Sequence, residues 1–200
     1  RIALFLSAMR HFRARLVEKG VPVVYRTLKP ENGPSTLASA LREDLWRLQP
    51  DRLILTEAGE HRVEQALPGA AREAGVPIEI RPDRHFLISR EEFRDYAGKR
   101  KQLRMEYFYR EMRKKHQVLM DGAKPAGGRW NYDASNRKSF GKQGPKSPPA
   151  PRRFKPDDVT RGVCDLVERQ FAEHPGSLEN FDWPVTSEQA SEALDDFLAH

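Results

Sequence analysis

The chain has 200 residues, 38% of them apolar and 32% charged, with a formal net charge of +6 and one cysteine. This length predicts one domain, or one domain with an appendage. A single cysteine excludes an internal disulfide framework and a cysteine-based metal site, and no apolar stretch approaches the roughly 20 residues of a membrane span. Because a secretory signal is also missing, we expect a cytoplasmic protein that has no contact with a membrane. We also expect a monomer.

The positive charge is concentrated in one segment. Residues 1–98 carry 16 basic and 14 acidic side chains, residues 99–156 carry 17 and 4, and residues 157–200 carry 2 and 11, so the net charges are +2, +13 and −9. A segment with such an excess attracts polyanions, and its binding to them is sensitive to salt. Packing against the acidic C-terminal segment explains the charge equally well, and charge alone does not separate the two hypotheses.

The first half of the chain alternates between helices and strands. Apolar residues spaced three and four apart predict helices, and short β-branched runs predict strands. The alternation indicates an α/β fold with a Rossmann-like doubly wound parallel sheet, covered on both faces, that binds ligands at the carboxyl ends of its strands. The predicted elements are a helix over 2–16, a strand over 22–28, a helix over 37–48 capped by Ser35 or Thr36, a strand over 52–56 buried on both faces, a helix over 60–74 and a strand over 77–82.

The second half has a different organisation. A basic helix is predicted over 101–115, and about forty residues without periodicity, rich in glycine and proline, follow it. Two acidic helices then close the chain. Because the first helix of the chain begins without a capping residue, we expect a fragment of a longer protein, divided into an α/β domain over 1–116, a basic connector over 117–156 and acidic helices over 157–200. The acidic helices are predicted to bury Val159, Val163, Leu166 and Val167 in the first, and Ala190, Leu194, Phe197 and Leu198 in the second, which starts from the capping box Thr186-x-x-Gln189.

One candidate site follows the strand over 52–56. In the stretch TEAGEHR, Thr56, Glu57 and Glu60 are predicted at the ligand-binding edge of the sheet. Glu60 also opens the next helix, where the helix dipole stabilises a carboxylate. Chemistry alone favours this plain capping role over a binding role.

A second candidate site lies in the connector, in the stretch GGRWNYDASNRK. Trp130 and Tyr132 offer stacking surfaces, and Arg137 and Lys138 can hold anions, which suits single-stranded or flipped bases. The alternative is that the two rings pin the loop to its own domain and leave the basic side chains in water. Nucleotide-binding, zinc-peptidase and nucleophile-elbow motifs are absent, and Cys164 is predicted to be a structural thiol. We therefore assign no catalytic residue and no metal ligand.

Five blocks of the sequence are distinctive: FLSAMRHF, TEAGEHRV, RKQLRMEYFYREMRKK, LMDGAKPAGGRWNYDASNRK and ENFDWPVT. They resemble the bacterial photolyase-related branch of the cryptochrome/photolyase family, and within it the prokaryotic (6-4) photolyases that carry an iron–sulfur cluster. The resemblance runs along essentially the whole chain. It implies a flavoprotein that repairs ultraviolet-damaged DNA with light, a carbon–carbon lyase, or a photoreceptor cryptochrome on the same scaffold without repair.

In that family an α/β domain holds an antenna chromophore, a ribityl-lumazine in this branch. A connector leads to a helical domain with FAD and four cysteines that ligate a [4Fe-4S] cluster. The resemblance implies that this chain is the α/β part, incomplete at its N-terminus because the first strand is missing, together with the connector, and that alone it is not catalytic. Ala58 stands where the family often has proline, and His61 where it often has tryptophan.

The resemblance also implies site residues. It places Phe5, Met9, Thr56, Glu57 and Glu60 on the antenna side, Arg137 on the flavin side, and Trp130, Asn136, Arg137, Lys138, Arg152 and Arg153 on the side of damaged DNA. A different hypothesis is that the chain is a light-independent nucleic-acid-binding α/β domain. The positive charge of residues 99–156 motivates it.

Overall fold

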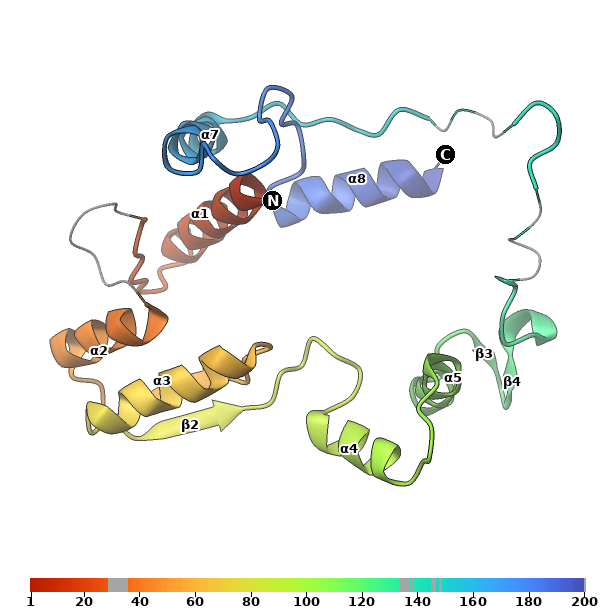
Figure 1. Cartoon of the computed structure of the whole chain (residues 1–200), viewed down its shortest axis with the longest axis horizontal. Coiled ribbons are helices and arrows are strands. Elements are labelled where there is room, and N and C mark those ends of the chain that lie inside the picture. Colours follow the sequence, from red (N-terminus) through yellow and green to blue (C-terminus); the bar gives the residue numbers. More distant parts are fainter. Residues whose placement is uncertain (29–35, 134–136, 138, 145–146, 148, 200) are drawn as a thin grey trace. The chain divides into compact units, whose positions relative to one another are not determined.

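The computed structural model describes residues 1–28, 36–133, 137, 139–144, 147 and 149–199 (Figure 1). Within these ranges it contains seven α-helices, one two-stranded parallel sheet and one short antiparallel hairpin. The chain divides into two compact units, Arg1–Gly33 with Phe140–His200, and Pro34–Ser139. The fold is therefore mixed α/β, as predicted, but it is mostly helical, and the described part contains two parallel strands where three were expected.

Within the described ranges, no helix combines the length and the apolar character that crossing a membrane requires.

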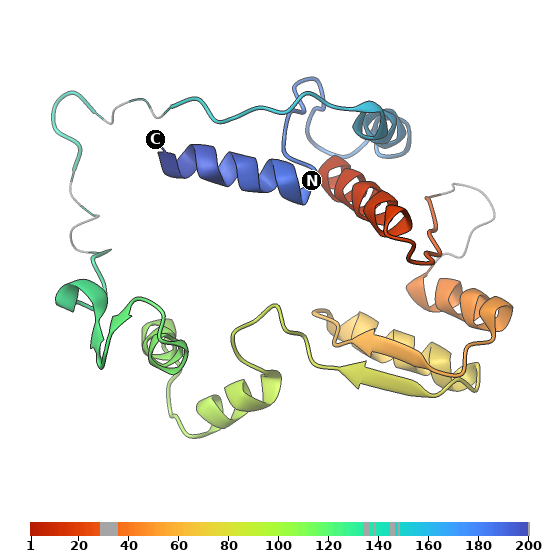
Figure 2. The same ribbon diagram turned by 180° about the vertical axis from the view of Figure 1, so that it is seen from behind.

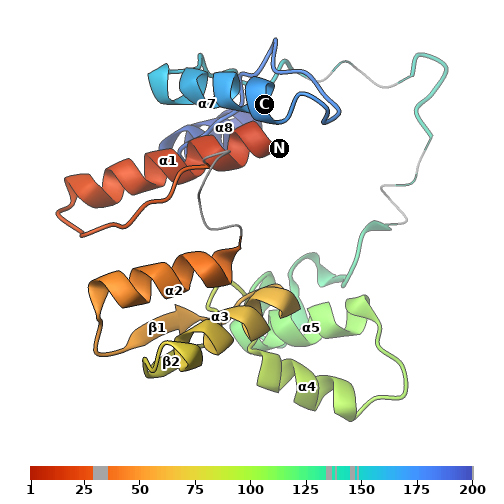
Figure 3. The same cartoon turned by 60° about the vertical axis from the view of Figure 1, so that its left-hand side comes forward.

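In the first unit, helix α1 (Ile2–Glu18) packs on helix α7 (Asp158–Gln170), and Figure 3 shows the two side by side. The buried residues of α1 are small, Ala3 and Ser7, and α7 contributes Thr160 and Val163. Small side chains let two helix backbones approach closely. The predicted helix is confirmed, but the helix packs through its small residues.

The large apolar side chains of α1 point elsewhere. Phe5, Met9 and Phe12 are exposed, although their spacing of three and four is typical of a packed face. Gly20 follows the helix with a φ of 73°, a conformation that glycine adopts without strain, so the predicted stop is confirmed.

The strand predicted over 22–28 is wrong. Residues 21–28 form neither helix nor strand, and the N–H of Val21 donates to the carbonyl of Leu16 at the end of α1 (3.0 Å). A strand is defined by its pairing with a neighbour. The β-branched composition of this stretch expresses a propensity, and the structure pairs no described strand with it.

The last helix of this unit, α8 (Ser187–Ala199), starts near the predicted capping box. The Thr186 hydroxyl accepts from the Gln189 N–H (3.2 Å), whereas the Gln189 side-chain oxygen accepts from the Val185 N–H (2.8 Å), one residue before the expected donor. Leu194, Phe197 and Leu198 are exposed, with Phe197 at 76%. Their predicted burial is wrong, because the described residues of this chain do not cover that face.

The helix α7 buries part of its predicted stripe. Val163 is fully buried, but Val159 is exposed, and the next residue, Thr160, is buried. The packed face of α7 is therefore rotated from the all-apolar stripe toward the side that meets α1.

In the second unit, helix α2 (Leu37–Leu48) packs on helix α3 (His61–Glu73), and strands β1 (Leu53–Thr56) and β2 (Ile78–Arg81) pair in parallel. Figure 2 shows the two strands in front of α3. The N-cap of α2 is Thr36, whose hydroxyl accepts from the Ser39 N–H (3.1 Å), as the sequence predicts. The other capping candidate, Ser35, lies outside the described residues.

The strand β1 was expected to be buried on both faces, and this is wrong. Its residues alternate between half-buried and exposed, and Ile54 is 41% exposed. Alternation of this kind is typical of a sheet with one covered face. Helix α3 contacts the sheet through β2.

Helix α4 (Arg90–Gly98) was not predicted. It starts from a capping box in which the Ser89 hydroxyl accepts from the Glu92 N–H (3.2 Å) and the Glu92 carboxylate accepts from the Ser89 N–H (3.0 Å). The following helix, α5 (Met105–His116), starts four residues later than predicted. The Phe108 ring of α5 lies edge-on to Phe93 and Tyr96 of α4, with ring centroids 5.4 and 5.0 Å apart.

The predicted connector is folded at its beginning. Strands β3 (Met120–Asp121) and β4 (Lys124–Pro125) form a hairpin, and a short 3₁₀ helix, η1 (Ala126–Gly128), follows. The expectation of a connector without regular structure from residue 117 onward is therefore wrong for these elements. The hairpin was not predicted because its two-residue strands are too short to show an alternation of apolar and polar residues.

Candidate functional site

The carboxyl ends of β1 and β2 meet at one edge of the sheet. The Glu57 N–H donates to the Arg81 carbonyl (2.8 Å), and the Asp83 N–H donates to the Glu57 carboxylate (3.4 Å). Thr56, the last residue of β1, is exposed at this edge. The prediction that Thr56 and Glu57 lie at the carboxyl edge of the sheet is confirmed, while their role there stays a prediction.

The segment 83–90 is tied to the loop after β1 at both of its ends. Beyond the Asp83 bond, Arg90 donates to the Ala58 carbonyl (2.5 Å) and forms an ion pair with Glu64 of α3 (2.6 Å). Between these two ties, Phe86 and Leu87 expose their side chains. An exposed aromatic ring in the segment that follows the carboxyl end of a strand offers a stacking face to a flat ligand. Sequence reasoning missed Phe86, whose signal is its place just after β2.

Two further polar residues shape this edge. His85 donates from its backbone N–H (2.9 Å) to the Asp83 carboxylate and places its ring Nδ1 2.6 Å from the same oxygen. The backbone bond first, and the ring bond second, lower the pKa of Asp83 below its ordinary value. Glu60 occupies the N-cap position of α3 without a side-chain capping bond and forms an ion pair with Arg62 (2.5 Å). Glu60 therefore occupies the predicted capping position, but its carboxylate makes no capping hydrogen bond.

The residues predicted for the antenna side fall in both units. Thr56, Glu57 and Glu60 share one loop in the second unit, whereas Phe5 and Met9 lie one turn apart on α1, in the first.

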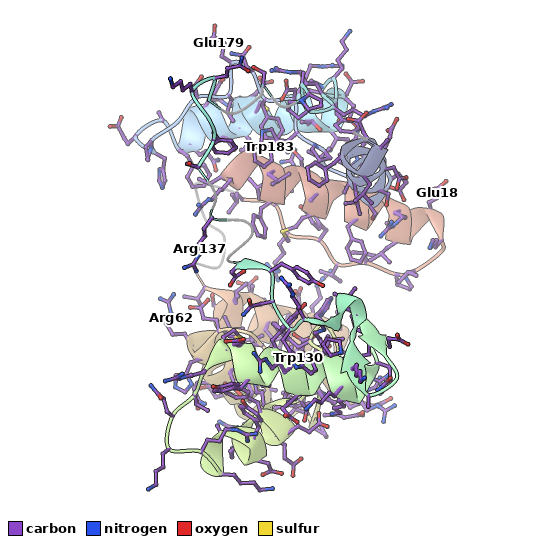
Figure 4. The ribbon with its side chains drawn as sticks, turned by 90° about the vertical axis from the view of Figure 1, so that its right-hand side faces the viewer. Glu18, Arg62, Trp130, Arg137, Glu179 and Trp183 are labelled. Carbon is purple, nitrogen blue, oxygen red and sulfur yellow. The ribbon has the colours of Figure 1, made fainter. Side chains whose placement is uncertain are left out.

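The connector residue Trp130 is surrounded by cations of α5. The Cζ of Arg113 lies 5.3 Å from the centroid of the Trp130 ring, the Nζ of Lys114 lies 5.4 Å from it, and the Cζ of Arg110 lies 5.5 Å from it. Figure 4 shows Trp130 against the helix. We call these four residues the Trp130 cluster. All three distances are within the range of cation–π attraction.

Arg113 is the buried member of the cluster, with 6% of its surface exposed. Its guanidinium donates to the backbone carbonyls of Val118 (3.3 Å) and Trp130 (3.3 Å) and to that of Leu119. A buried charge is expensive unless its donors are satisfied, and these carbonyls satisfy them. Arg113 therefore joins α5 to the hairpin and to Trp130.

Further bonds hold the stretch after η1. Glu106 forms an ion pair with Arg110 and accepts from the Asn131 side-chain amide (3.0 Å). The Tyr132 hydroxyl donates to the Gly127 carbonyl (2.9 Å), and a Cβ at Gly127 would lie 2.1 Å from that hydroxyl. Gly127 also has a φ of 71°, so this position requires glycine. The hypothesis that the two aromatic residues pin the loop to its own domain is supported at this point.

The other residues predicted for the DNA side are spread along the chain. Arg137 is exposed, and Figure 4 marks it apart from Trp130. Arg152 forms an ion pair with Glu192, and Arg153 forms one with Asp182 (2.6 Å), both within the first unit. Asn136 and Lys138 lie outside the described residues.

The lone thiol does not fit an iron–sulfur cluster. Such a cluster is held by four cysteine thiolates, and the chain has Cys164 alone. Burial, followed by the nearby Glu168 and Asp165 carboxylates, raises the pKa of the Cys164 thiol above its ordinary value. Among the described residues, no group of three or more His, Cys, Asp or Glu side chains could hold a metal ion. We therefore assign no metal or cluster ligand to this chain.

Comparisons with known proteins find one family model and two similar proteins. A family model described as "Deoxyribodipyrimidine photo-lyase-related protein" matches residues 1–183. The chain is 43% identical over 206 aligned residues to a protein named (6-4) photolyase from Agrobacterium fabrum (strain C58 / ATCC 33970), an alignment that covers 100% of this chain and 40% of that protein. It is 23% identical over 138 residues to Uncharacterized protein R852 of Acanthamoeba polyphaga mimivirus, covering 67% of this chain and 68% of that protein. The chain thus spans less than half the length of the photolyase that it matches.

Proposed function

The chain belongs to the family of deoxyribodipyrimidine photo-lyase-related proteins, and from this premise we propose that it works as the antenna-side part and connector of a light-dependent DNA-repair flavoprotein. The observation that carries the proposal is the 43% identity to a (6-4) photolyase along the whole chain. Because the chain spans 40% of that relative, the repair activity belongs to the longer protein. We propose that the α/β domain covers residues 1–116, the connector covers 117–156 and the acidic helices cover 157–200.

The proposed antenna side is the carboxyl edge of the parallel strands. A flat heteroaromatic chromophore of the ribityl-lumazine type would stack on Phe86, with the Thr56 hydroxyl and the Glu57 carboxylate as polar partners. The ties of Asp83 and Arg90 to the loop after β1 support this role, because they fix the segment that carries Phe86. Phe5, Met9 and Glu60 are also proposed as residues of the antenna side.

The proposed flavin and DNA side is the connector. FAD, when bound by the longer protein, supplies the light-driven electron transfer, and the residues of this chain bind and position. Arg137 is proposed on the flavin side, where an exposed guanidinium can donate to anionic groups. The iron–sulfur cluster is assigned to the remainder of the longer protein. The residues proposed to contact damaged DNA are Trp130, Asn136, Arg137, Lys138, Arg152 and Arg153.

A chimera tests the function. This chain replaces the matching 40% of the Agrobacterium photolyase, and light-dependent repair of an ultraviolet-irradiated oligonucleotide is measured against the unmodified relative. We expect repair in light and none in darkness. A chimera that binds flavin, as read from its visible spectrum, and yet repairs nothing in light would contradict the proposal. It would leave the photoreceptor without repair as the better hypothesis.

A point variant tests the antenna side within the same chimera. Phe86→Ala should lower chromophore binding, because it removes the stacking wall. The control is Leu87→Ala, which removes a neighbouring exposed apolar side chain of the same segment. Equal chromophore occupancy in Phe86→Ala and in the unmodified chimera would contradict the assignment of this edge.

A further inference from the structure

Three cations converge on one indole ring in the Trp130 cluster, and this arrangement has a consequence for binding. We propose that the cluster binds the phosphodiester backbone of DNA, with Arg110 and Lys114 as the donors and Arg113 as a positioning residue. The inference rests on the proposed function, which supplies DNA as the polyanion. It deepens that function by naming a phosphate contact on α5, outside the residues assigned to the DNA side above except for Trp130.

The charge balance of the cluster is positive. Lys114 forms a long ion pair with Glu111 (3.9 Å), beyond hydrogen-bond distance, and its side chain is 51% exposed. With the Glu106 and Glu111 carboxylates counted against Arg110, Arg113 and Lys114, one positive charge is left in excess. Glu106 is shared between Arg110 and the Asn131 amide. Like charges gathered around one ring repel one another, so an anion between them is favourable.

The helix dipole explains only part of this arrangement. Cations in the last turn of a helix are stabilised by the carbonyl end of the dipole without any ligand. Lys114 lies in the last turn of α5, but Arg110 lies a turn earlier. Arg110 and Lys114 are four residues apart and therefore share one face of α5, and the Trp130 ring of the connector lies against both.

Arg113 has a different role from its two neighbours. It is 6% exposed, and its donors are used by three backbone carbonyls, one of them that of Trp130. Because so little of its surface is exposed, it is poorly accessible to a ligand. What it does is fix the main chain of Trp130, and with it the ring that Arg110 and Lys114 face.

The ligand chemistry is phosphate. Three cations already lie within 5.5 Å of the ring centroid, which leaves little of the ring for base stacking. A guanidinium and an ammonium group side by side are strong donors to phosphate oxygens. The exposed ring of Tyr107, whose centroid lies 5.6 Å from the Arg110 Cζ, can flank a strand without reading its sequence.

The test measures DNA binding by the whole 200-residue chain at a series of salt concentrations, with a fluorescein-labelled single-stranded oligothymidylate as the probe. Lys114→Ala and Arg110→Ala should each weaken binding at low salt and lower the slope of log affinity against log salt by about 0.7, the value for one lost phosphate contact on a single strand. The matched control is Arg72→Ala, which removes the same charge from an exposed position on α3 and should leave the slope unchanged. The same oligonucleotide with abasic sites should keep the effect of Lys114→Ala.

A second readout is the emission of Trp130 in a chain with Trp46→Phe and Trp183→Phe, which should change when the oligonucleotide binds and stay unchanged in Lys114→Ala. The inference would be overturned if Lys114→Ala and Arg110→Ala had the same salt slope as Arg72→Ala. It would also be overturned if Lys114→Ala had no effect on abasic DNA, or if the unmodified chain did not bind the oligonucleotide. Repair by the chimera with unchanged slopes would overturn the inference alone. Lowered slopes without repair would overturn the proposed function and keep the binding site.

Discussion

The two ends of the basic segment 99–156 balance their charge in different ways. Near residue 113, cations of α5 meet an indole ring and backbone carbonyls. Near residue 152, arginines meet the carboxylates of Glu192 and Asp182 from the acidic end of the chain. Sequence charge left two hypotheses open, attraction of a polyanion and internal neutralisation. The second operates at Arg152 and Arg153, and the Trp130 cluster keeps a net positive charge.

The difference teaches that the partner decides what a cation contributes. Carboxylate partners at the surface neutralise a charge and add little stability. Carbonyl partners in a buried place satisfy the donors but leave the charge in place. Removing a cation should therefore have a large structural effect at Arg113 and a small one at Arg152 and Arg153.

The largest expected effect comes from Arg113→Ala. It removes a buried guanidinium, takes the Arg113 donor from the carbonyls of Val118 and Trp130, and leaves the Leu119 carbonyl with the Ala126 N–H alone. This loss should destabilise the second unit by about 3 kcal/mol. Native-state hydrogen exchange over residues 117–131 measures it. The backbone N–H of Ala126, which donates to the Leu119 carbonyl (2.9 Å), is the most direct reporter.

The control for this prediction is Arg110→Ala, because Arg110 lies on the same helix with a more exposed side chain. It should change the exchange of Ala126 far less. Equal exchange in the two variants would mean that the hairpin does not depend on Arg113, and the contrast between the two ends of the segment would lose its basis.

The elements that the sequence predicted well are those whose signal is local. The helices α1, α2, α3 and α7 follow from apolar spacing, and the cap at Thr36 follows from a hydroxyl at the right place. Helix α4 had an equally local signal, since Ser89 and Glu92 form a capping box. Its short length and its high charge hid it, because nine residues make too few turns to display a period.

The features that the sequence did not predict depend on distant partners. The stretch 22–28 has strand composition, but no described strand pairs with it. The burial of Arg113 has no local pattern, because its acceptors are backbone carbonyls, which every residue carries. The burial expected for Leu194 and Phe197 failed for the same reason, since an apolar stripe is buried only where another surface meets it.

A medium effect is expected where the acidic end of the chain meets α1. Asp157 caps α7 by accepting from the Thr160 N–H (2.8 Å), and His11 of α1 lies 3.2 Å from its carboxylate. Asp157→Ala should destabilise the first unit by about 1 kcal/mol, the usual cost of losing a cap. Urea unfolding followed by Trp183 emission measures this, and Asp158→Ala, at an exposed neighbour, is the control. A loss as large in Asp158→Ala would contradict the capping role.

The same carboxylate gives this contact a pH dependence. Burial opposes its ionisation, but the Thr160 bonds and His11 outweigh burial and hold the pKa of Asp157 below its ordinary 3.8. A depressed pKa in the folded state means that the contribution is present above the unfolded value and is lost as the pH falls through the folded value. Acid unfolding of the first unit should therefore be less steep in Asp157→Ala.

A smaller effect is expected at the neutralised end of the basic segment. The double variant Arg152→Ala and Arg153→Ala breaks two exposed ion pairs, which are worth about 0.5 kcal/mol each at low salt. The loss should shrink as salt is added, because exposed pairs are screened. Trp183 emission during urea unfolding at two salt concentrations measures both points. A loss above about 2 kcal/mol, or one that salt does not change, would show that these arginines pack more deeply than the comparison allows.

The smallest effect on stability, with a clear titration signal, is expected at Lys115, the neighbour of Lys114 on α5. Lys115 forms an ion pair with Glu92 of α4, and this bond first, with the Ser89 N–H second, lowers the pKa of Glu92 from 4.5 to about 2. In Lys115→Met the pKa of Glu92, measured by NMR titration, should rise toward 4.5, while Lys114→Met should leave it unchanged. Because the pair is exposed, the free energy of unfolding should change little in either variant. A rise in Lys114→Met would mean that both lysines face Glu92, and the separation of Lys114 into the Trp130 cluster would be wrong.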